Sequence, residues 1–373
     1  MRIGVPKEIK DHEYRVALVP SSVTELVSHG HRVTVEQGAG LGIGVPDTEY
    51  EAAGAEIADS AEQIFTEAEL VVKVKEPLAA ERARLHRDQV LFTYLHLAPD
   101  PDQTRDLIAS GATCIAYETV TSASGGLPLL TPMSEVAGRL APQVGAHCLE
   151  KAQGGRGMLL GGVPGVLPAE VVILGGGVSG THAAMIALGM GADVTVIDRS
   201  ADVLRRLAVQ FGSRLRTVFS TQGTIAQLVK RADLLIGAVL VPGAAAPKLI
   251  TRDMVRSMKR GSVIVDIAID QGGCAETSKA TTHSDPTYVV DGIVHYCVAN
   301  MPGTVARTAS FALNNVTLPF VLALADHGWR RAVHDDPHLR AGLNVHEGAI
   351  TCRPVADSLG YPYTAPEDIL RLH

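Results

Sequence analysis

The stretch VVILGGGVSG, Val171 to Gly180, decides the fold of this chain. Its four leading apolar residues, three of them β-branched, predict a buried parallel strand. Gly175, Gly177 and Gly180 follow at the spacing G-x-G-x-x-G, and the next residues, HAAMIALGM, predict a helix. A strand, a glycine-rich turn and a helix in this order bring backbone N–H groups and a helix N-terminus against a pyrophosphate. The stretch therefore predicts a dinucleotide-binding α/β domain.

The next strand, DVTVID, ends in Asp198. An acid at this point accepts hydrogen bonds from the adenosine ribose hydroxyls and repels a 2′-phosphate, which favours NAD over NADP. The neighbouring Arg199 works in the opposite direction, because an arginine there meets the phosphate. The alternative interpretation is a glycine-rich turn in an α/β protein that binds no nucleotide, and an acid at the end of the next strand favours the dinucleotide site over it.

Composition excludes several classes of function. The chain has 373 residues, 46% of them hydrophobic and 20% charged, which is typical of globular protein and sufficient for two domains. The net charge of −7 predicts no nucleic-acid partner. Five scattered cysteines without a C-x-x-C pair favour a reducing, cytoplasmic location over disulfides or zinc. Neither a signal peptide nor an uninterrupted apolar stretch long enough for a membrane span is found, so no membrane partner is expected.

Strand and helix patterns also alternate through the first half of the chain, where LVVKVKEP and QVLFTYLHL are apolar strands. We expect an α/β fold of two Rossmann-like, doubly wound domains with a cleft between them. Residues 131–307 form the expected NAD-binding domain, and residues 1–130 with 308–373 form a discontinuous catalytic domain. Pro142 and Pro319 are expected to kink or interrupt the helices in which they lie.

Polar residues near the ends of two strands of the first domain are candidates for substrate chemistry. Lys75 follows LVVKV, near the ligand side of a doubly wound sheet, whereas we expect Lys73 to be a lysine that snorkels at an edge strand. His96 ends VLFTYLHL and suits a general acid or base, although a hydrogen-bonded core histidine explains it equally well.

Two further candidates stand in other segments. Asp270 closes VIVDIAID before a Gly-Gly turn, where a carboxylate either accepts a proton or caps the turn, and Asp266 is expected to be structural. Arg15 in EYRVALVP either clamps a carboxylate or is a surface arginine.

Taken together, the blocks MRIGVPKEIKDHEYRVALVP, VKVKEP, LFTYLHLA, PLLTPMSEVAGRLA, GGRGMLLGGVPGV, VDIAIDQGGC and VANMPGTV resemble bacterial L-alanine dehydrogenases over essentially the whole chain. The resemblance implies reversible oxidative deamination of L-alanine by NAD to pyruvate, ammonia and NADH. It also implies a two-domain subunit that assembles into a homohexamer.

Residue roles follow from the same resemblance. It implies that Arg15 and Lys75 bind the substrate, that His96 is the acid/base at the substrate oxygen, and that Asp270 manages the attacking water or ammonia. The cofactor contacts that the fingerprint and the resemblance together predict are Ser134, Gly175, Gly177, Val178, Ser179, Gly180, Asp198, Ser220, Val239, Leu240, Ile267, Lys279, Val298, Asn300 and Met301. Two positions depart from the family: Val203 stands where a lysine is frequent, and Lys279 where an arginine is frequent.

Glu118 and His327 match a magnesium site of some relatives in the family. A His–carboxylate pair without a third protein ligand suits magnesium poorly, so no metal is expected. Three other functions stay open: the nucleotide-binding subunit of a transhydrogenase, which passes hydride to a partner nucleotide; a saccharopine dehydrogenase; and an NADH sensor without catalysis.

Overall fold

The computed structural model describes residues 1–239 and 246–371. The chain divides into two compact units, which are Met1–Met133 together with Val305–His373, and Ser134–Thr304. One boundary falls inside helix α6 (Thr131–Cys148) and the other inside the short helix η6 (Met301–Val305). The first unit is therefore assembled from both ends of the chain, and the second is a continuous insertion.

The first unit is built on a sheet with the strand order β15-β14-β6-β5-β4-β1-β2-β3 among the described residues. Strands β1 to β6 pair parallel with one another, whereas β14 pairs antiparallel with β6 and with β15. Their bounds are β1 (Arg2–Val5), β2 (Arg32–Glu36), β3 (Glu56–Ala58), β4 (Leu70–Val72), β5 (Val90–Thr93), β6 (Thr113–Ala116), β14 (Leu343–His346) and β15 (Ala349–Ile350). The parallel part has the doubly wound order 3-2-1-4-5-6.

The second unit repeats this order in its own sheet, β12-β13-β11-β10-β7-β8-β9, where β12 is the antiparallel strand. Its strands are β7 (Glu170–Leu174), β8 (Asp193–Asp198), β9 (Leu215–Phe219), β10 (Leu234–Gly237), β11 (Val263–Asp266), β12 (Thr287–Val290) and β13 (Ile293–Tyr296). The two units thus share one architecture, and the expected α/β fold with two Rossmann-like domains is confirmed.

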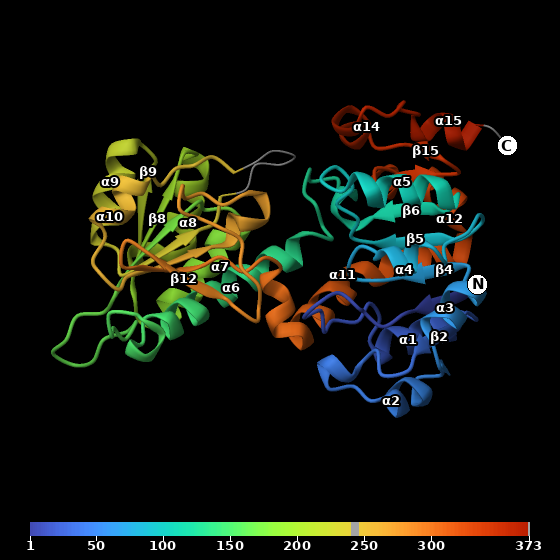
Figure 1. Cartoon of the computed structure of the whole chain (residues 1–373), viewed down its shortest axis with the longest axis horizontal. Coiled ribbons are helices and arrows are strands. Elements are labelled where there is room, and N and C mark those ends of the chain that lie inside the picture. The colour runs from blue at the N-terminus through green and yellow to red at the C-terminus, as the bar shows by residue number, and fades with distance from the viewer. Residues whose placement is uncertain (240–245, 372–373) are drawn as a thin grey trace. The chain divides into compact units, whose positions relative to one another are not determined.

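Helices pack against both sheets, with α3 on β1 and α1 on β2 in the first unit, and α7 and α9 on β7 in the second (Figure 1). The first unit contains α1 (Pro20–Ser28), α2 (Asp47–Ala52), α3 (Ala61–Glu67), α4 (Ala79–Arg82), α5 (Pro101–Ser110), α11 (Ala306–His327), α12 (Trp329–Asp335), α13 (Pro337–Arg340), α14 (Arg353–Leu359) and α15 (Pro366–Arg371). The second contains α7 (Val178–Gly189), α8 (Ala201–Phe211), α9 (Gln222–Arg231) and α10 (Arg252–Ser257). The central strands are buried, as expected of parallel sheets covered by helices.

Two sequence expectations about helices and strands are wrong. The expected interruptions are absent, because Pro142 and Pro319 lie inside continuous helices α6 and α11, where the loss of one backbone hydrogen bond is tolerated in a long, partly buried helix. The strands are also shorter than their apolar runs: β4 ends at Val72, β5 at Thr93 and β11 at Asp266. The candidate residues therefore stand on the connections that follow these strands.

One helical stretch of the described residues, Met301–His327, is long and apolar enough to cross a membrane by length and composition alone. Its buried side chains include Asn314, whose Oδ1 accepts hydrogen bonds from the Val19 N–H and the Ser22 hydroxyl at 2.9 and 2.7 Å. These bonds tie α11 to the segment that leads into α1, as in a core helix.

Candidate functional site

The three substrate-side candidates of the first unit follow the carboxyl ends of neighbouring strands. Arg15 stands on the connection after β1, Lys75 on the one after β4, and His96 on the one after β5. Strands β1, β4 and β5 lie side by side, and the strand order reverses between β1 and β4. Ligands of doubly wound sheets bind at such a reversal, outside the carboxyl ends. The topology therefore brings these three residues to one edge of the first sheet.

Arg15 is a buried residue, with 2% of its surface exposed, so the surface alternative is wrong. Its Nε and Nη2 both donate to the Glu13 carboxylate at 2.6 Å, and its backbone N–H donates to Oε1 of Glu13 at 3.1 Å. Nη1 lies 3.1 Å from the sulfur of Met133. Burial alone would lower the pKa of Arg15, but the Glu13 carboxylate outweighs it and raises that pKa. The guanidinium is thus a fixed cation.

Lys75 is held through its backbone by Glu8. Oε1 of Glu8 accepts the N–H of Val74 at 2.7 Å and that of Lys75 at 3.4 Å. The other oxygen of Glu8 accepts from Nζ of Lys73 at 3.1 Å. A single buried carboxylate therefore fixes the course of the chain at the end of β4.

Lys73 is fully buried, so the expectation of a snorkelling lysine is wrong. Strand β4 lies between β1 and β5 rather than at an edge, and Nζ of Lys73 also donates to Glu81 at 2.7 Å. Burial would lower the pKa of Lys73, yet the two carboxylates raise it. For Glu8, burial prevails over the attraction of Lys73 and raises the pKa. Lys73 is the cation of a buried ion triad beneath the connection that carries Lys75.

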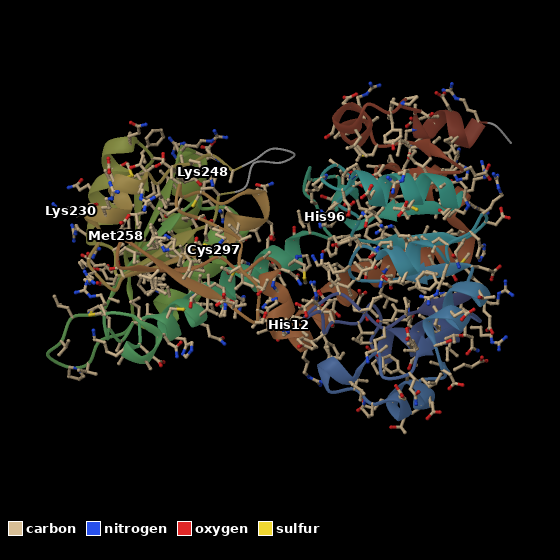
Figure 2. All side chains as sticks on the ribbon, in the orientation of Figure 1. His12, His96, Lys230, Lys248, Met258 and Cys297 are labelled. Atoms are coloured by element: carbon tan, nitrogen blue, oxygen red, sulfur yellow. The ribbon has the colours of Figure 1, made fainter. Side chains whose placement is uncertain are left out.

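His96, which is labelled in Figure 2, has a strained backbone and a side chain that is partly exposed. Its φ of 49° is left-handed, a conformation that costs a non-glycine residue about 1–3 kcal/mol and is often found at functional sites. The Glu118 carboxylate holds this turn, because it accepts the N–H of Leu95 at 3.2 Å and that of His96 at 2.6 Å. Oε1 of Glu118 also lies 3.8 Å from Nδ1 of His96, whose side chain is 46% exposed. The exposed imidazole argues against a core histidine.

The glycine-rich turn of the second unit has the shape that the pyrophosphate of a dinucleotide requires. Gly175 has a φ of +95°, and a Cβ added there would lie 2.6 Å from the Ala238 carbonyl oxygen. A Cβ on Gly180 would lie 1.8 Å from the Gly175 oxygen, so only glycine permits α7 to start so close to β7. A Cβ on Gly177 would meet nothing within 4 Å. The open space over Gly177, at the exposed start of α7, is what a pyrophosphate needs.

Val178 and Ser179 belong to this first turn of α7, where Val178 is 42% exposed. The Ser179 hydroxyl donates to the carbonyl oxygen of Ser134 in α6 at 2.9 Å. Ser134 therefore lies beside the glycine-rich turn, within the same unit. The structure brings these three predicted cofactor contacts together.

Asp198, the last residue of β8, is turned toward the same loop. One of its oxygens accepts the N–H of Gly176 at 2.7 Å and the other accepts that of Ser200 at 2.7 Å. Its backbone oxygen accepts the N–H of Ser220 at 3.0 Å, which places Ser220 next to it after β9. The Asp198 carboxylate thus holds the backbone of the turn through these two bonds, and it also lies where it could accept hydrogen bonds from ribose hydroxyls.

Asp270 lies in the short helix η5 (Ile267–Gln271), which follows β11, and it is exposed. Its Oδ1 accepts the N–H of Asn300 at 3.4 Å. The fully buried Asp266 holds this connection from within, since it accepts the N–H of Ala268 and Cys274 and the hydroxyl of Ser278. The structural role expected of Asp266 is confirmed.

Most of the remaining predicted cofactor contacts that the structure describes follow carboxyl ends of strands in the second sheet. Val239 comes after β10, Ile267 after β11, and Val298 and Met301 after β13, with Val298 and Met301 buried. Lys279 is exposed, and its N–H donates to the Tyr288 hydroxyl at 2.7 Å. Leu240 lies outside the described residues.

The two metal candidates show no ligand geometry. Within residues 1–239 and 246–371 no group of three His, Cys, Asp or Glu side chains could hold a metal ion. Glu118 is engaged with backbone N–H groups, and His327 is an exposed residue at the end of α11.

Sequence reasoning gave no role to Glu8 and Glu13 and no positioning role to Glu118. Glu8 and Glu13 are two charged residues in the segment KEIKDHEYR, which reads as solvated surface. Only the strand order shows that this segment crosses the carboxyl end of a buried sheet. The signal in the sequence that could have indicated a role for Glu8 and Glu13 is the high density of charged residues directly after an apolar strand.

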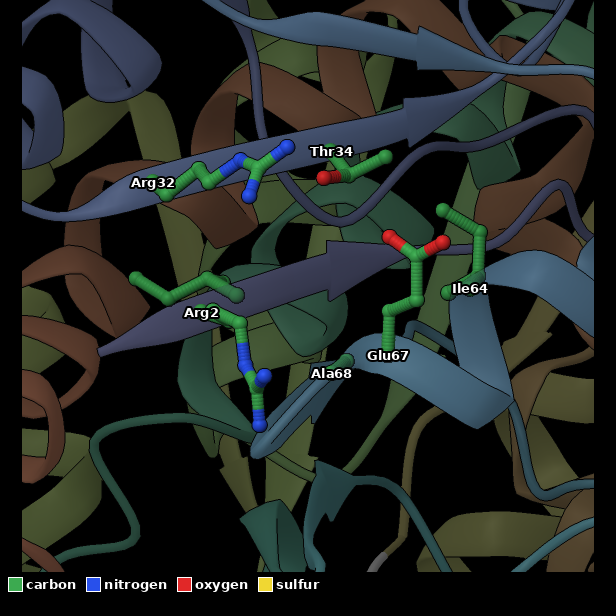
Figure 3. A pocket seen from close by; sticks show the side chains of 7 residues that line it. Arg2, Arg32, Thr34, Ile64, Glu67 and Ala68 are labelled. Atoms are coloured by element: carbon green, nitrogen blue, oxygen red, sulfur yellow. The ribbon is translucent and has the colours of Figure 1, made fainter.

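A small cavity elsewhere in the first unit, lined by residues such as Arg2, Arg32 and Glu67, is unconnected with these side chains (Figure 3). Its volume is about 10 Å³, which is room for one water molecule.

Comparison with known proteins identifies the family. Residues 4–137 match the model of the alanine dehydrogenase/PNT N-terminal domain, and residues 141–353 match that of the C-terminal domain. The chain is 61% identical to an alanine dehydrogenase of Halomonas elongata over 99% of its length and 100% of that protein. It is 56% identical to an alanine dehydrogenase of Bacillus subtilis over 100% of its length and 98% of that protein.

Solved structures agree with these sequence relatives. An L-alanine dehydrogenase superposes with a TM-score of 0.94 at 53% identity, covering 96% of this chain and 99% of that one. A transhydrogenase from Sinorhizobium meliloti superposes with a TM-score of 0.81 at 28% identity, covering 94% and 99%. With both domain models matched and such identity over the full length, the chain belongs to the alanine dehydrogenase/PNT family.

Proposed function

We propose that this protein is an alanine dehydrogenase. It converts L-alanine, NAD and water reversibly into pyruvate, ammonium, NADH and a proton. The observation that supports the proposal is that Arg15, Lys75 and His96 follow the carboxyl ends of the neighbouring strands β1, β4 and β5. A 2-oxo acid needs such a set, because it presents a carboxylate and a carbonyl oxygen to be bound and protonated.

NAD is the cofactor that the second unit suits. Bound NAD supplies the hydride acceptor for the Cα–H of alanine. Gly175, Gly177, Gly180 and the first turn of α7 would hold the pyrophosphate, and the Asp198 carboxylate would hold the ribose hydroxyls.

The substrate is fixed by two cations of the first unit. The Arg15 guanidinium binds the carboxylate of alanine or pyruvate, and the Lys75 ammonium binds its carbonyl oxygen and stabilises charge that develops there. Orientation of this kind lowers a barrier by up to about 7–11 kcal/mol. The glutamates behind Arg15 and Lys75 hold both residues in place before the substrate arrives.

His96 and Asp270 handle protons. His96 removes the hydroxyl proton from the carbinolamine as ammonia leaves, and returns a proton to the substrate oxygen in the reverse direction. Asp270 accepts a proton from the attacking water or ammonia.

We further propose that the enzyme is a cytoplasmic homo-oligomer, a hexamer as in the family. Exposed apolar side chains in the segment between η3 (Lys151–Gln153) and β7 support self-association, since monomers rarely expose such groups together. They are Leu159, Val163, Val166 and Leu167.

The test is the reduction of NAD, followed by NADH absorbance at alkaline pH, with L-alanine, L-serine, glycine, L-glutamate and saccharopine. We expect a strong signal confined to L-alanine and its close homologues. Activity with saccharopine, or hydride exchange between nucleotides without any amino acid, would instead identify one of the related functions.

A further inference from the structure

The ion pair between Arg15 and Glu13 is unusual in its burial. Their side chains are 2% and 0% exposed, and two parallel hydrogen bonds of 2.6 Å join them. The first unit has a second pair of the same geometry, Arg32 with Glu56, with bonds of 2.8 and 2.7 Å, but its side chains are 59% and 53% exposed. The two pairs differ mainly in their access to water.

Stability does not explain the buried pair. Removing two charges from water costs about as much as their attraction returns, so a buried pair is seldom a net stabiliser. What the pair does provide is a fixed orientation of a planar cation. Glu13 is itself fixed, because Oε1 also accepts the backbone N–H of Arg15.

The orientation suits a carboxylate ligand. Glu13 takes the edge formed by Nε and Nη2, so a ligand carboxylate meets the guanidinium at an edge that includes Nη1. Nη1 lies 3.1 Å from the Met133 sulfur, and a thioether is a weak acceptor. A carboxylate oxygen is a far better acceptor for this N–H group.

We propose that Glu13 is a positioning residue, which acts on the substrate through Arg15 and sets the affinity for the carboxylate of alanine and pyruvate. This inference rests on the proposed function of Arg15. Glu13 itself does not touch the substrate: it aims the guanidinium. Its loss therefore weakens substrate binding and leaves cofactor binding intact.

The experiment compares Glu13→Gln with Glu56→Gln, which removes the same charge from the exposed pair. Steady-state rates of pyruvate reduction give KM and kcat, and fluorescence titration gives the Kd for NADH. For Glu13→Gln we expect the KM for pyruvate to rise about 10- to 100-fold, the effect of charge-assisted hydrogen bonds, with a smaller fall in kcat and an unchanged Kd. Glu56→Gln should match the parent enzyme in all three values.

A double-mutant cycle with Arg15→Gln separates this inference from the function on which it rests. If Glu13 acts through Arg15, adding Glu13→Gln to Arg15→Gln changes KM by less than about twofold. Equal increments of KM in both backgrounds would overturn the positioning role. An unchanged KM in Arg15→Gln would instead remove Arg15 from the substrate site.

A second variant is needed in case Glu13→Gln does not fold, because Glu13→Gln leaves the Arg15 guanidinium buried without its carboxylate partner. Glu13→Asp keeps the charge but shortens the reach, so we expect a raised KM for pyruvate at an unchanged melting temperature. A parent-like KM in a folded Glu13→Asp enzyme would contradict the inference.

Discussion

The parallel strands of both units have the order 3-2-1-4-5-6, but different chemical groups stand at the carboxyl ends of these strands. The first unit buries charged side chains there, namely Glu8, Glu13, Arg15, Lys73 and Glu81. The second unit presents backbone after its first strand, in the turn from Gly175 to Gly180, and its buried Asp266 only holds the connection after β11. The same scaffold thus offers side-chain chemistry in one unit and a cradle of N–H groups in the other.

This difference follows from the ligands. A small 2-oxo acid has two polar groups, and cations of fixed direction can discriminate between them. A pyrophosphate is extended and shared by many reactions, and close approach of glycine backbone suffices to bind it. We therefore expect substitutions in the first unit to act on substrate and stability, and substitutions in the glycine-rich turn of the second unit to act on cofactor affinity. Asp270, which we propose as a proton acceptor, is the residue of the second unit expected to act on the substrate.

The largest expected effect concerns His96. In His96→Ala, kcat should fall about 10²- to 10⁴-fold, the usual contribution of a general acid or base, while the Kd for NADH stays constant. His86→Ala, at an exposed histidine of the same unit, is the control. NADH absorbance gives the rates and fluorescence titration gives the NADH affinities. A loss of NADH affinity in His96→Ala would contradict the assignment of substrate chemistry to the first unit and cofactor binding to the second.

Lys73→Met tests the buried charges of the first unit. It leaves Glu8 and Glu81 buried without their cation, which should lower the free energy of unfolding by about 3–5 kcal/mol. Urea denaturation followed by the fluorescence of Trp329, the single tryptophan, reports on this unit. The exposed Lys7→Met should unfold like the parent protein, and a similar result for Lys73→Met would refute the triad as a structural element.

Two alanine substitutions at the ends of α7, one at Gly177 directly before the helix and one at its last residue Gly189, sharpen the assignment of the second unit. Gly177→Ala should weaken NADH binding by about 1–3 kcal/mol, because its Cβ fills the space over the turn. Gly189→Ala, also in open space, should keep full affinity and gain about 0.5–1 kcal/mol of stability. Titration and thermal melting give both values, and equal NADH affinities in the two variants would exclude the turn from cofactor binding.

Asp198→Gly tests the ribose contact. It should relax the preference for NAD over NADP by about five- to tenfold, the effect of about 1 kcal/mol between exposed charges. The measurement is the ratio of kcat/KM for the two cofactors. An unchanged ratio would leave Asp198 with only its bonds to Gly176 and Ser200.

The smallest effect is expected at the exposed pair of Arg32 and Glu56. The hydrogen bond from Arg32 lowers the pKa of Glu56 below its ordinary 4.5, so any stability it adds is present above that pH and is lost as the pH falls through the lowered pKa. Because the pair is exposed, that contribution is small, and Glu56→Gln should melt close to the parent even at neutral pH. A clear drop in melting temperature at neutral pH would show that exposed and buried pairs are closer in effect than we infer.

The sequence by itself determined the second unit and the positions of the chemistry. Strand, glycine-rich turn, helix and Asp198 were predictable because they rest on local rules: β-branched residues extend, and only glycine permits a φ of +95° at Gly175. The candidates Lys75, His96 and Asp270 were found because polar residues at the ends of apolar runs are conspicuous. The ends of the strands before these residues were not predicted correctly, since β4, β5 and β11 all end before the apolar run does.

Only the tertiary structure decided which charges are buried. Lys73 looked like an edge lysine and Arg15 like a surface arginine until β4 was placed between β1 and β5 and the segment after β1 was placed across their ends. The sequence also did not show that α6 and α11 continue through Pro142 and Pro319, since local helix propensity predicts a break at proline. Burial and ion pairing depend on which distant segments become neighbours, and that is a non-local property of the fold.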